Sequence, residues 1–238
     1  TQGVFRADGA RPAMADSPMP RFDLYDFAAC DSMSVQFTRG CPFCCEFCDV
    51  IELFGRAPRS KSPEQLLAEL ERLYELGWRR SVFIVDDNFI GDRNRARQLL
   101  KQLIEWQRRH YYPFSFDTQA SIDLARDDEL LRLMADANFG MIFLGIETPD
   151  LDSLEAVGKR QNTRQPMLEA IEAIQRAGMV PAAGLIIGFD GEAPGAGRRI
   201  ERFMEEAAIP ETTFSMLQAL PNTALRRRLE REGRMLRS

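Results

Sequence analysis

The chain lacks several features that would place a protein in a class directly. It has a single histidine among 238 residues and no apolar run approaching the roughly 20 residues that span a bilayer. Its formal net charge is -5, and its arginines alternate with acids, so no overall basic surface is present for nucleic acid. We therefore expect no membrane span and no nucleic-acid partner.

The beginning of the chain also lacks two features. Thr1-Gln2-Gly3 contains neither an initiator methionine nor the charged-then-apolar order of a signal peptide. Residues 1–33 are rich in Pro, Ala and Asp and show no periodicity. We interpret 1–33 as a linker or lead-in from a missing N-terminal region, and 34–238 as the core domain.

Disulfides are not expected either. Four of the five cysteines lie between Cys41 and Cys48, where close spacing makes a poor disulfide framework. A cysteine cluster of this kind usually holds metal in a reducing compartment. The predicted location is therefore cytoplasmic.

A repeated unit of helix, glycine and apolar strand predicts the fold class. Ser62-Pro63-Glu64-Gln65 has the sequence of a helix start, with a capping serine and a glutamine three residues later. Apolar strands alternating with amphipathic helices indicate a parallel sheet covered by helices. Six units are too few for a closed eight-fold barrel, which leaves an open six-unit barrel or a doubly wound sheet. The six strands are expected at Ser34–Thr38, Val82–Val85, Phe114–Thr118, Met141–Ile146, Gly184–Gly188 and Thr213–Leu217.

Polar side chains follow four of these strands: Asp86-Asp87-Asn88, Gln119, Glu147 and Glu192. In α/β barrels and open sheets, active sites form at the carboxyl ends of the strands. These residues therefore mark the expected functional edge.

The cysteine loop allows two ligand patterns, which are Cys41-x3-Cys45-x2-Cys48 and a pair of CxxC units that includes Cys44. The second pattern would suit zinc, but adjacent side chains at positions 44 and 45 diverge, and zinc normally takes its ligand pairs from separate knuckles. Three thiolates suit an iron–sulfur cube with one iron left open. We expect Cys44 to be a small buried side chain and not a ligand.

With the aromatic Phe47 before its last cysteine, this CxxxCxxC loop resembles the radical S-adenosylmethionine (SAM) superfamily over about residues 34–225. The resemblance implies an α/β fold, a partial (β/α)6 TIM-like barrel with parallel strands and helices outside. It also implies a 4Fe–4S cluster on Cys41, Cys45 and Cys48. SAM would bind the open iron and be cleaved reductively to a 5′-deoxyadenosyl radical. No side chain is assigned as catalytic, because the cofactors carry the chemistry.

The resemblance also implies which residues contact SAM. Asp86, Asp87 and Asn88 occupy the place of a polar motif that contacts the methionyl amino group. Glu147 matches an acid that binds ribose or the methionyl group, and Gln119 is included for its place at a strand end. The remaining matches concern adenine, flanked by Ile186 and Gly188 and met by the backbone of Phe47, and a Pro-Gly-Thr motif matched by Pro221-Asn222-Thr223.

The strand-end motifs look most like the cobalamin-associated branch of the superfamily, which contains methyltransferases and ring-forming cyclases. That branch implies cobalamin bound by a domain outside this chain, a small-molecule substrate, and an external electron donor such as a flavodoxin or ferredoxin. Two alternatives remain open. They are an iron–sulfur electron-transfer protein without SAM chemistry, and a zinc-stabilised binding module.

Overall fold

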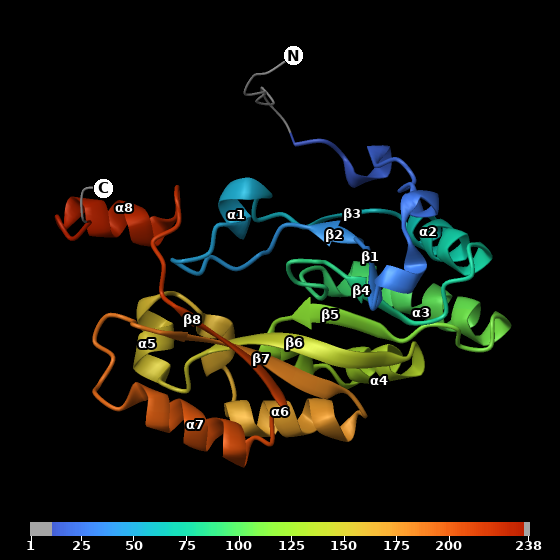
Figure 1. The fold of residues 1–238 in the computed structure, drawn as a ribbon. Coiled ribbons are helices and arrows are strands. Elements are labelled where there is room, and N and C mark those ends of the chain that lie inside the picture. Colours follow the sequence, from blue (N-terminus) through green and yellow to red (C-terminus); the bar gives the residue numbers. More distant parts are fainter. Residues whose placement is uncertain (1–10, 236–238) are drawn as a thin grey trace.

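Parallel strands in sequence order build the central sheet. In the computed structural model, which describes residues 11–235, each strand pairs with the next one listed. The order is β1 (Ser32–Val35), β4 (Ser81–Ile84), β5 (Phe116–Ala120), β6 (Phe139–Glu147), β7 (Val180–Ile187) and β8 (Glu211–Met216). The sheet forms an open half-barrel with helices around it, which confirms the partial (β/α)6 barrel (Figure 1).

The connecting helices form the outer layer of the half-barrel. They are α2 (Pro63–Glu75), α3 (Arg93–Arg109), α4 (Asp128–Asp136), α6 (Met167–Arg176) and α7 (Ala196–Glu206). Three shorter helices, α1 (Val50–Leu53), α5 (Leu151–Ala156) and α8 (Ala224–Arg231), gather toward one end of the sheet in Figure 1. Among residues 11–235, no helix is long and apolar enough to cross a membrane.

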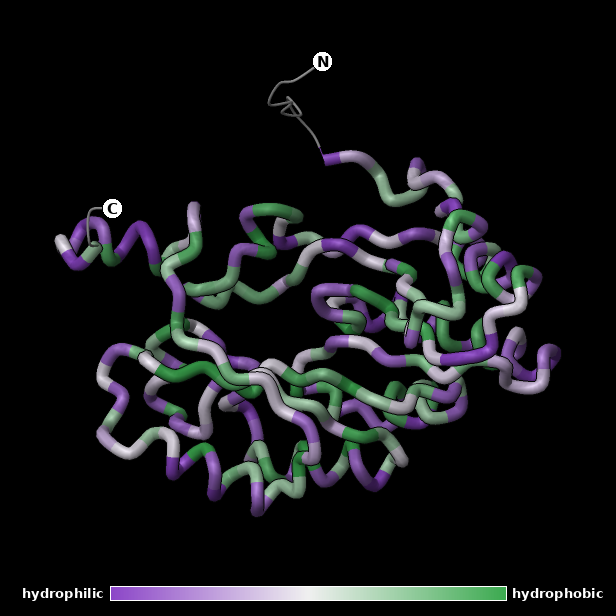
Figure 2. Tube along the Cα trace, viewed as in Figure 1, coloured by the Kyte–Doolittle hydropathy of each residue, from purple (hydrophilic) through white to green (hydrophobic). Residues whose placement is uncertain are grey.

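Side-chain alternation separates the core from the hollow of the half-barrel. Along β6, Ile142, Leu144 and Ile146 are fully buried and belong to the hydrophobic core. The intervening Phe143 and Gly145 point to the other face, where they line a cavity. In Figure 2, hydrophobic residues are concentrated along the central strands, whereas α8 is mostly hydrophilic.

The start of α2 confirms the predicted cap. Ser62 Oγ accepts a hydrogen bond from the Gln65 amide at 3.2 Å, and Gln65 Oε1 accepts one from the Ser62 amide at 2.9 Å. The two bonds satisfy backbone donors that the first turn of a helix leaves free.

The predicted strand Ser34–Thr38 was wrong in its bounds. β1 ends at Val35, and the chain leaves the sheet before β2 (Thr38–Arg39), which pairs antiparallel with β3 (Arg59–Ser60). The amides of Phe37 and Thr38 donate to Asp86, so they are unavailable for the sheet. The starts of β5, β6 and β8 are each offset by two residues from the prediction and that of β7 by four, which is usual for strand ends predicted from pattern alone.

Residues 11–31 lie against the domain as three single-turn 3₁₀ helices, η1 (Met14–Asp16), η2 (Phe22–Leu24) and η3 (Phe27–Ala29). The side chain of Phe22 belongs to the hydrophobic core, and the carbonyl of Ala15 accepts a hydrogen bond from Gln65 of α2 at 2.8 Å. The interpretation of 1–33 as a lead-in from a further region stays a prediction, and its first ten residues lie outside the described part.

Candidate functional site

A cavity of about 220 Å³ lies at the carboxyl ends of β4, β5 and β6. Most of the exposed area of its wall is apolar, although several polar and charged side chains reach it. It is lined by Cys41, Phe43, Cys45, Phe47, Cys48, Val50, Ile51, Asp87, Asn88, Gln119, Ala120, Ser121, Phe143, Gly145, Glu147, Lys159 and Gln161. Eight of the eleven predicted site residues are therefore brought together, and Asp86, Ile186 and Gly188 are not among them.

A glycine and two aspartates hold the start of the cysteine loop. Gly40 has φ +100°, and a Cβ there would lie 2.8 Å from the Gly55 carbonyl oxygen, so only glycine fits without displacing backbone. The Gly40 amide donates to Asp87 Oδ2 at 3.0 Å. Cys41 in turn donates its amide to the Gly55 carbonyl.

Asp86 is fully buried and bonded to backbone, not directed into the cavity. Its Oδ1 accepts the amides of Phe37 (2.8 Å) and Thr38 (2.9 Å), and its Oδ2 accepts the Thr38 hydroxyl at 2.8 Å. Burial raises the pKa of this carboxyl to about 6, against the opposing effect of these hydrogen bonds. In this structure Asp86 braces the segment before the cysteine loop, and a contact with SAM stays a prediction.

Three cysteines face the cavity from one loop. Burial raises the pKa of the Cys41 thiol and raises that of Cys48 to about 11. Cysteine binds iron as a thiolate and not as a thiol, so metal binding here would release protons. Cys44 is exposed and is absent from the cavity wall, so the expectation that it is buried was wrong.

The donor set of the loop suits an iron–sulfur cluster. Cys41, Cys45 and Cys48 all line the cavity, and thiolates are the ligands by which proteins hold such clusters.

Two carboxamides from different segments approach two of the cavity cysteines. Asn88 Nδ2 lies 3.9 Å from Cys41 Sγ, and Ser121 fixes its orientation by donating its amide to Asn88 Oδ1 at 3.2 Å. Gln161 Nε2 lies 3.5 Å from Cys45 Sγ. Donors near cluster sulfurs are among the factors that set reduction potential.

Glu147 ends β6 inside the cavity and pairs with Lys159. Both side chains are nearly buried, and Glu147 adopts φ +65°, a conformation that non-glycine residues rarely take. Asn162 supports the bend by donating to the carbonyls of Gly145 (2.9 Å) and Ile146 (3.1 Å). The pair places one negative and one positive group side by side on the wall.

The predicted adenine residues lie beyond the cavity wall. Ile186 is half-buried near the end of β7, and Gly188 is exposed just after it. The following residue, Phe189, is buried and its ring centroid lies 6.2 Å from that of Phe47. Contacts of Ile186 and Gly188 with adenine stay predictions.

Sequence reasoning missed Lys159 and Gln161. Lys159 lies between α5 and η5 (Arg160–Thr163), and Gln161 lies within η5, so no strand-end pattern marks either residue. The sequence offered one signal for Lys159: a carboxylate such as Glu147 at the end of a buried strand needs a partner.

A family model for the radical SAM superfamily matches residues 35–204. The chain belongs to the radical SAM superfamily. Membership implies a 4Fe–4S cluster and SAM, and the cavity with its three cysteines fits both. The alternatives of a simple electron carrier and a zinc-stabilised binding module receive no support.

This radical SAM chain is similar to curated methyltransferases. It is 60% identical over 236 residues to "Uncharacterized methyltransferase sll1242" of Synechocystis sp., covering 99% of this chain and 44% of that protein. It is 43% identical over 219 residues to "Hopanoid C-2 methylase" of Rhodopseudomonas palustris, covering 92% and 42% respectively. The chain thus spans less than half the length of these relatives.

Solved structures show the same fold at low sequence identity. The methyltransferase TsrM from Kitasatospora setae, with cobalamin and a [4Fe-4S] cluster bound, matches with a TM-score of 0.73 and 19% identity, over 84% of this chain and 39% of that one. The cobalamin-dependent SAM radical enzyme OxsB matches with a TM-score of 0.64 over 85% and 35%.

Proposed function

We propose that this radical SAM enzyme is the core of a cobalamin-dependent methyltransferase that acts on a small, largely apolar molecule. One observation carries the proposal. A single apolar-walled cavity brings Cys41, Cys45 and Cys48 together with the charged pair of Glu147 and Lys159. This wall would match a cofactor with one zwitterionic end that chelates metal. Its apolar part would surround the reactive end of that cofactor.

The residues of this chain would divide the work as follows. The three cysteines would hold three irons of the cluster and leave the fourth open. Glu147 would accept from an amine or ribose hydroxyl of SAM, and Lys159 would face its carboxylate. When bound, the cluster and SAM supply a 5′-deoxyadenosyl radical by reductive cleavage. Phe43 and other apolar wall residues would keep water from it.

Methylation is preferred to cyclisation because the more similar relatives carry methyltransferase names. An anaerobic cyclase of Rubrivivax gelatinosus is also similar, at 28% identity over 66% of this chain. An apolar substrate is proposed from the cavity wall and from the likeness to the hopanoid C-2 methylase.

Cobalamin would be bound by a region outside these 238 residues. The relatives are more than twice as long as the matched part, and two solved neighbours are described with cobalamin. We further propose an external reductant, such as a flavodoxin or ferredoxin, and a reducing, cytoplasmic compartment that preserves the cluster.

Anaerobic reconstitution tests the proposal in steps. Iron and sulfide should bind at about four of each per chain, as a 4Fe–4S cluster requires. Dithionite-reduced protein should then convert SAM to 5′-deoxyadenosine and methionine. Binding of iron without SAM cleavage would favour an electron carrier and overturn the proposal. Absence of corrinoid from a purified longer form supplied with cobalamin would remove the cobalamin branch only.

A further inference from the structure

Helix α8 lies against the cysteine loop and is tied to one residue of it. Glu46 stands between Cys45 and Phe47, and its backbone is bonded on both sides. Its amide donates to the Val157 carbonyl at 2.8 Å, and its carbonyl accepts the amide of Leu225 from α8 at 2.9 Å. An amide in the first turn of α8, which has no acceptor within the helix, thus donates to the cysteine loop.

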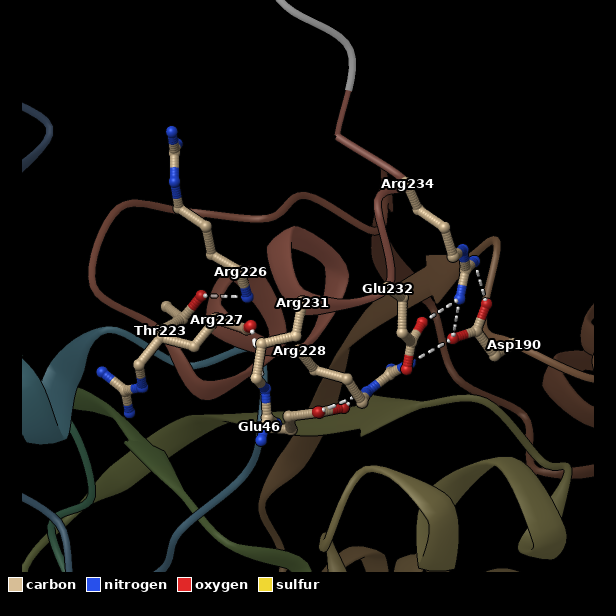
Figure 3. Close-up of polar contacts among 9 residues, drawn as sticks. All are labelled: Glu46, Asp190, Thr223, Arg226, Arg227, Arg228, Arg231, Glu232 and Arg234. Atoms are coloured by element: carbon tan, nitrogen blue, oxygen red, sulfur yellow. Dashed lines mark hydrogen bonds and ion pairs between the residues drawn. The ribbon is translucent and has the colours of Figure 1, made fainter.

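The Glu46 side chain makes a two-point contact with the same helix (Figure 3). Arg228 Nε lies 2.6 Å from Glu46 Oε1, and Arg228 Nη2 lies 3.0 Å from Oε2. The Glu46 side chain is 17% exposed and that of Arg228 is 28% exposed. Such a forked pair fixes both orientation and distance, which a single charge contact does not.

Arg228 also reaches the loop that follows β7. Its Nη1 lies 2.8 Å from Asp190 Oδ2, and Arg234 contacts both oxygens of Asp190 at 2.5 and 3.0 Å. These guanidinium groups, that of Arg234 foremost, hold the pKa of Asp190 well below its usual range. Asp190 directly follows Phe189, whose ring meets that of Phe47. One arginine therefore joins two loops whose aromatic residues are already in contact.

The entry to α8 is built to place this helix. Asn222 adopts φ +64°, a left-handed conformation that asparagine tolerates. Glycine adopts this conformation easily, which explains why the Pro-Gly-Thr motif that Pro221-Asn222-Thr223 resembles has glycine at this position. Thr223 is fully buried and caps the helix by accepting the Arg226 amide at 3.2 Å. The helix direction is thus set before Arg228 is reached.

We propose that Arg228 is a positioning residue, which holds Glu46, and with it the cysteine loop, against the loop after β7. It touches neither the cavity nor the cysteines. Its role in SAM binding rests on the proposed function, because only then do Phe47 and the β7 loop frame a cofactor. Its role in holding the loop does not.

The first test uses the iron-free whole chain and needs no cofactor. Amide exchange at Glu46, Cys48 and Leu225, which are all hydrogen-bonded, should become about tenfold faster or more in Arg228→Ala. Amides within β5 and β6 should be unchanged. Arg226→Ala is the matched control. Among residues 11–235 the Arg226 side chain pairs with Glu230 of the same helix at 2.9 Å, and in Figure 3 it points away from Glu46.

Glu46→Gln removes the partner charge with little change in size, and it decides the question if Arg228→Ala does not fold. It should speed exchange at the same three amides. Exchange in Glu46→Gln and Arg228→Ala equal to that in Arg226→Ala would overturn the proposal.

The second test measures SAM affinity of the reconstituted protein. Arg228→Ala should keep its iron and bind SAM about tenfold more weakly, because loops that are no longer held in place must be ordered when SAM binds. Equal affinities in Arg228→Ala and Arg226→Ala would overturn the link to SAM. Wild-type protein that binds no SAM would refute the proposed function, while the exchange comparison would still decide the role of Arg228.

Discussion

The carboxyl ends of β4 and β6 present the same pattern and use it differently. Each buried strand runs into an acid, Asp86 after β4 and Glu147 in β6. Asp86 turns away from the cavity and receives three hydrogen bonds from the segment that leads to the cysteines. Glu147 turns into the cavity and meets Lys159.

Segments beyond the two strand ends also approach different cysteines of the loop. Asn88, after β4, faces Cys41, and Gln161, beyond β6, faces Cys45. One acid thus supports the loop and the other lines the space beside it. An acid at the end of a buried strand therefore indicates a functional edge, but the groups around it decide its task.

The largest effect should come from the cysteines between these walls. Cys41→Ala, Cys45→Ala and Cys48→Ala should each lose the cluster, because in the proposed site these three thiolates are its protein ligands. Cys44→Ala is the control and should keep it, since Cys44 is exposed and off the wall. Iron and sulfide counts after anaerobic reconstitution measure this. A cluster lost in Cys44→Ala and kept in Cys45→Ala would reverse the assignment.

Next in size is the β6 acid. Glu147→Gln should retain iron and bind SAM about ten- to a hundredfold more weakly, as loss of a charge-assisted hydrogen bond of about 1.5–3 kcal/mol implies. Titration of the reconstituted protein measures it. Lys159→Met serves as comparison, because it leaves Glu147 in place without its partner. Unchanged SAM affinity with lowered stability would make the pair purely structural.

Asp86, the acid that follows β4, should make the free energy of unfolding depend on pH. Its folded pKa of about 6 lies above the usual value, so the folded state binds the extra proton between about pH 4 and pH 6. The free energy of unfolding should therefore fall as pH rises through this window, by up to about 3 kcal/mol, and then level off.

Asp86→Asn should remove that slope, whereas Asp136→Asn at the exposed end of α4 should keep it. Urea unfolding at several pH values compares the three proteins. Identical slopes in all of them would show that Asp86 does not titrate in this window.

The smallest effect tests the room around the Glu147–Lys159 pair. A Cβ on Gly145 would lie 2.6 Å from both Glu147 Oε1 and Lys159 Nζ, whereas one on Gly140 would lie 3.6 Å from its nearest neighbour, Asp117. Gly145→Ala should lower the free energy of unfolding by only about 1–2 kcal/mol, because the flexible end of Lys159 can shift away from the added methyl group. The shifted pair should then bind SAM more weakly. Gly140→Ala in the same strand should be tolerated. Equal melting temperatures and SAM affinities would show that the pair has free space.

The cysteine loop and the order of strands could be predicted from local sequence. The spacing of Cys41, Cys45 and Cys48 is a local pattern, and so are the capping box at Ser62 and the alternation of helix and strand. Each depends on residues a few positions apart, so one stretch of sequence carries the whole signal.

Partnerships between distant residues could not be predicted in this way. Gln161 meets Cys45 across 116 positions, and Arg228 meets Glu46 across 182. The departure of the chain from the sheet after Val35 likewise depends on Asp86, which lies 49 positions beyond Phe37.

The sequence by itself thus determined the family, the parallel half-barrel and the three cysteines that face its open end. Only the tertiary structure decided that Asp86 supports the loop while Glu147 enters the cavity. The physical reason is that a buried carboxylate must find donors, and donors are chosen by position in space. For Asp86 these are the backbone amides of Phe37 and Thr38, and for Glu147 the partner is the ammonium group of Lys159.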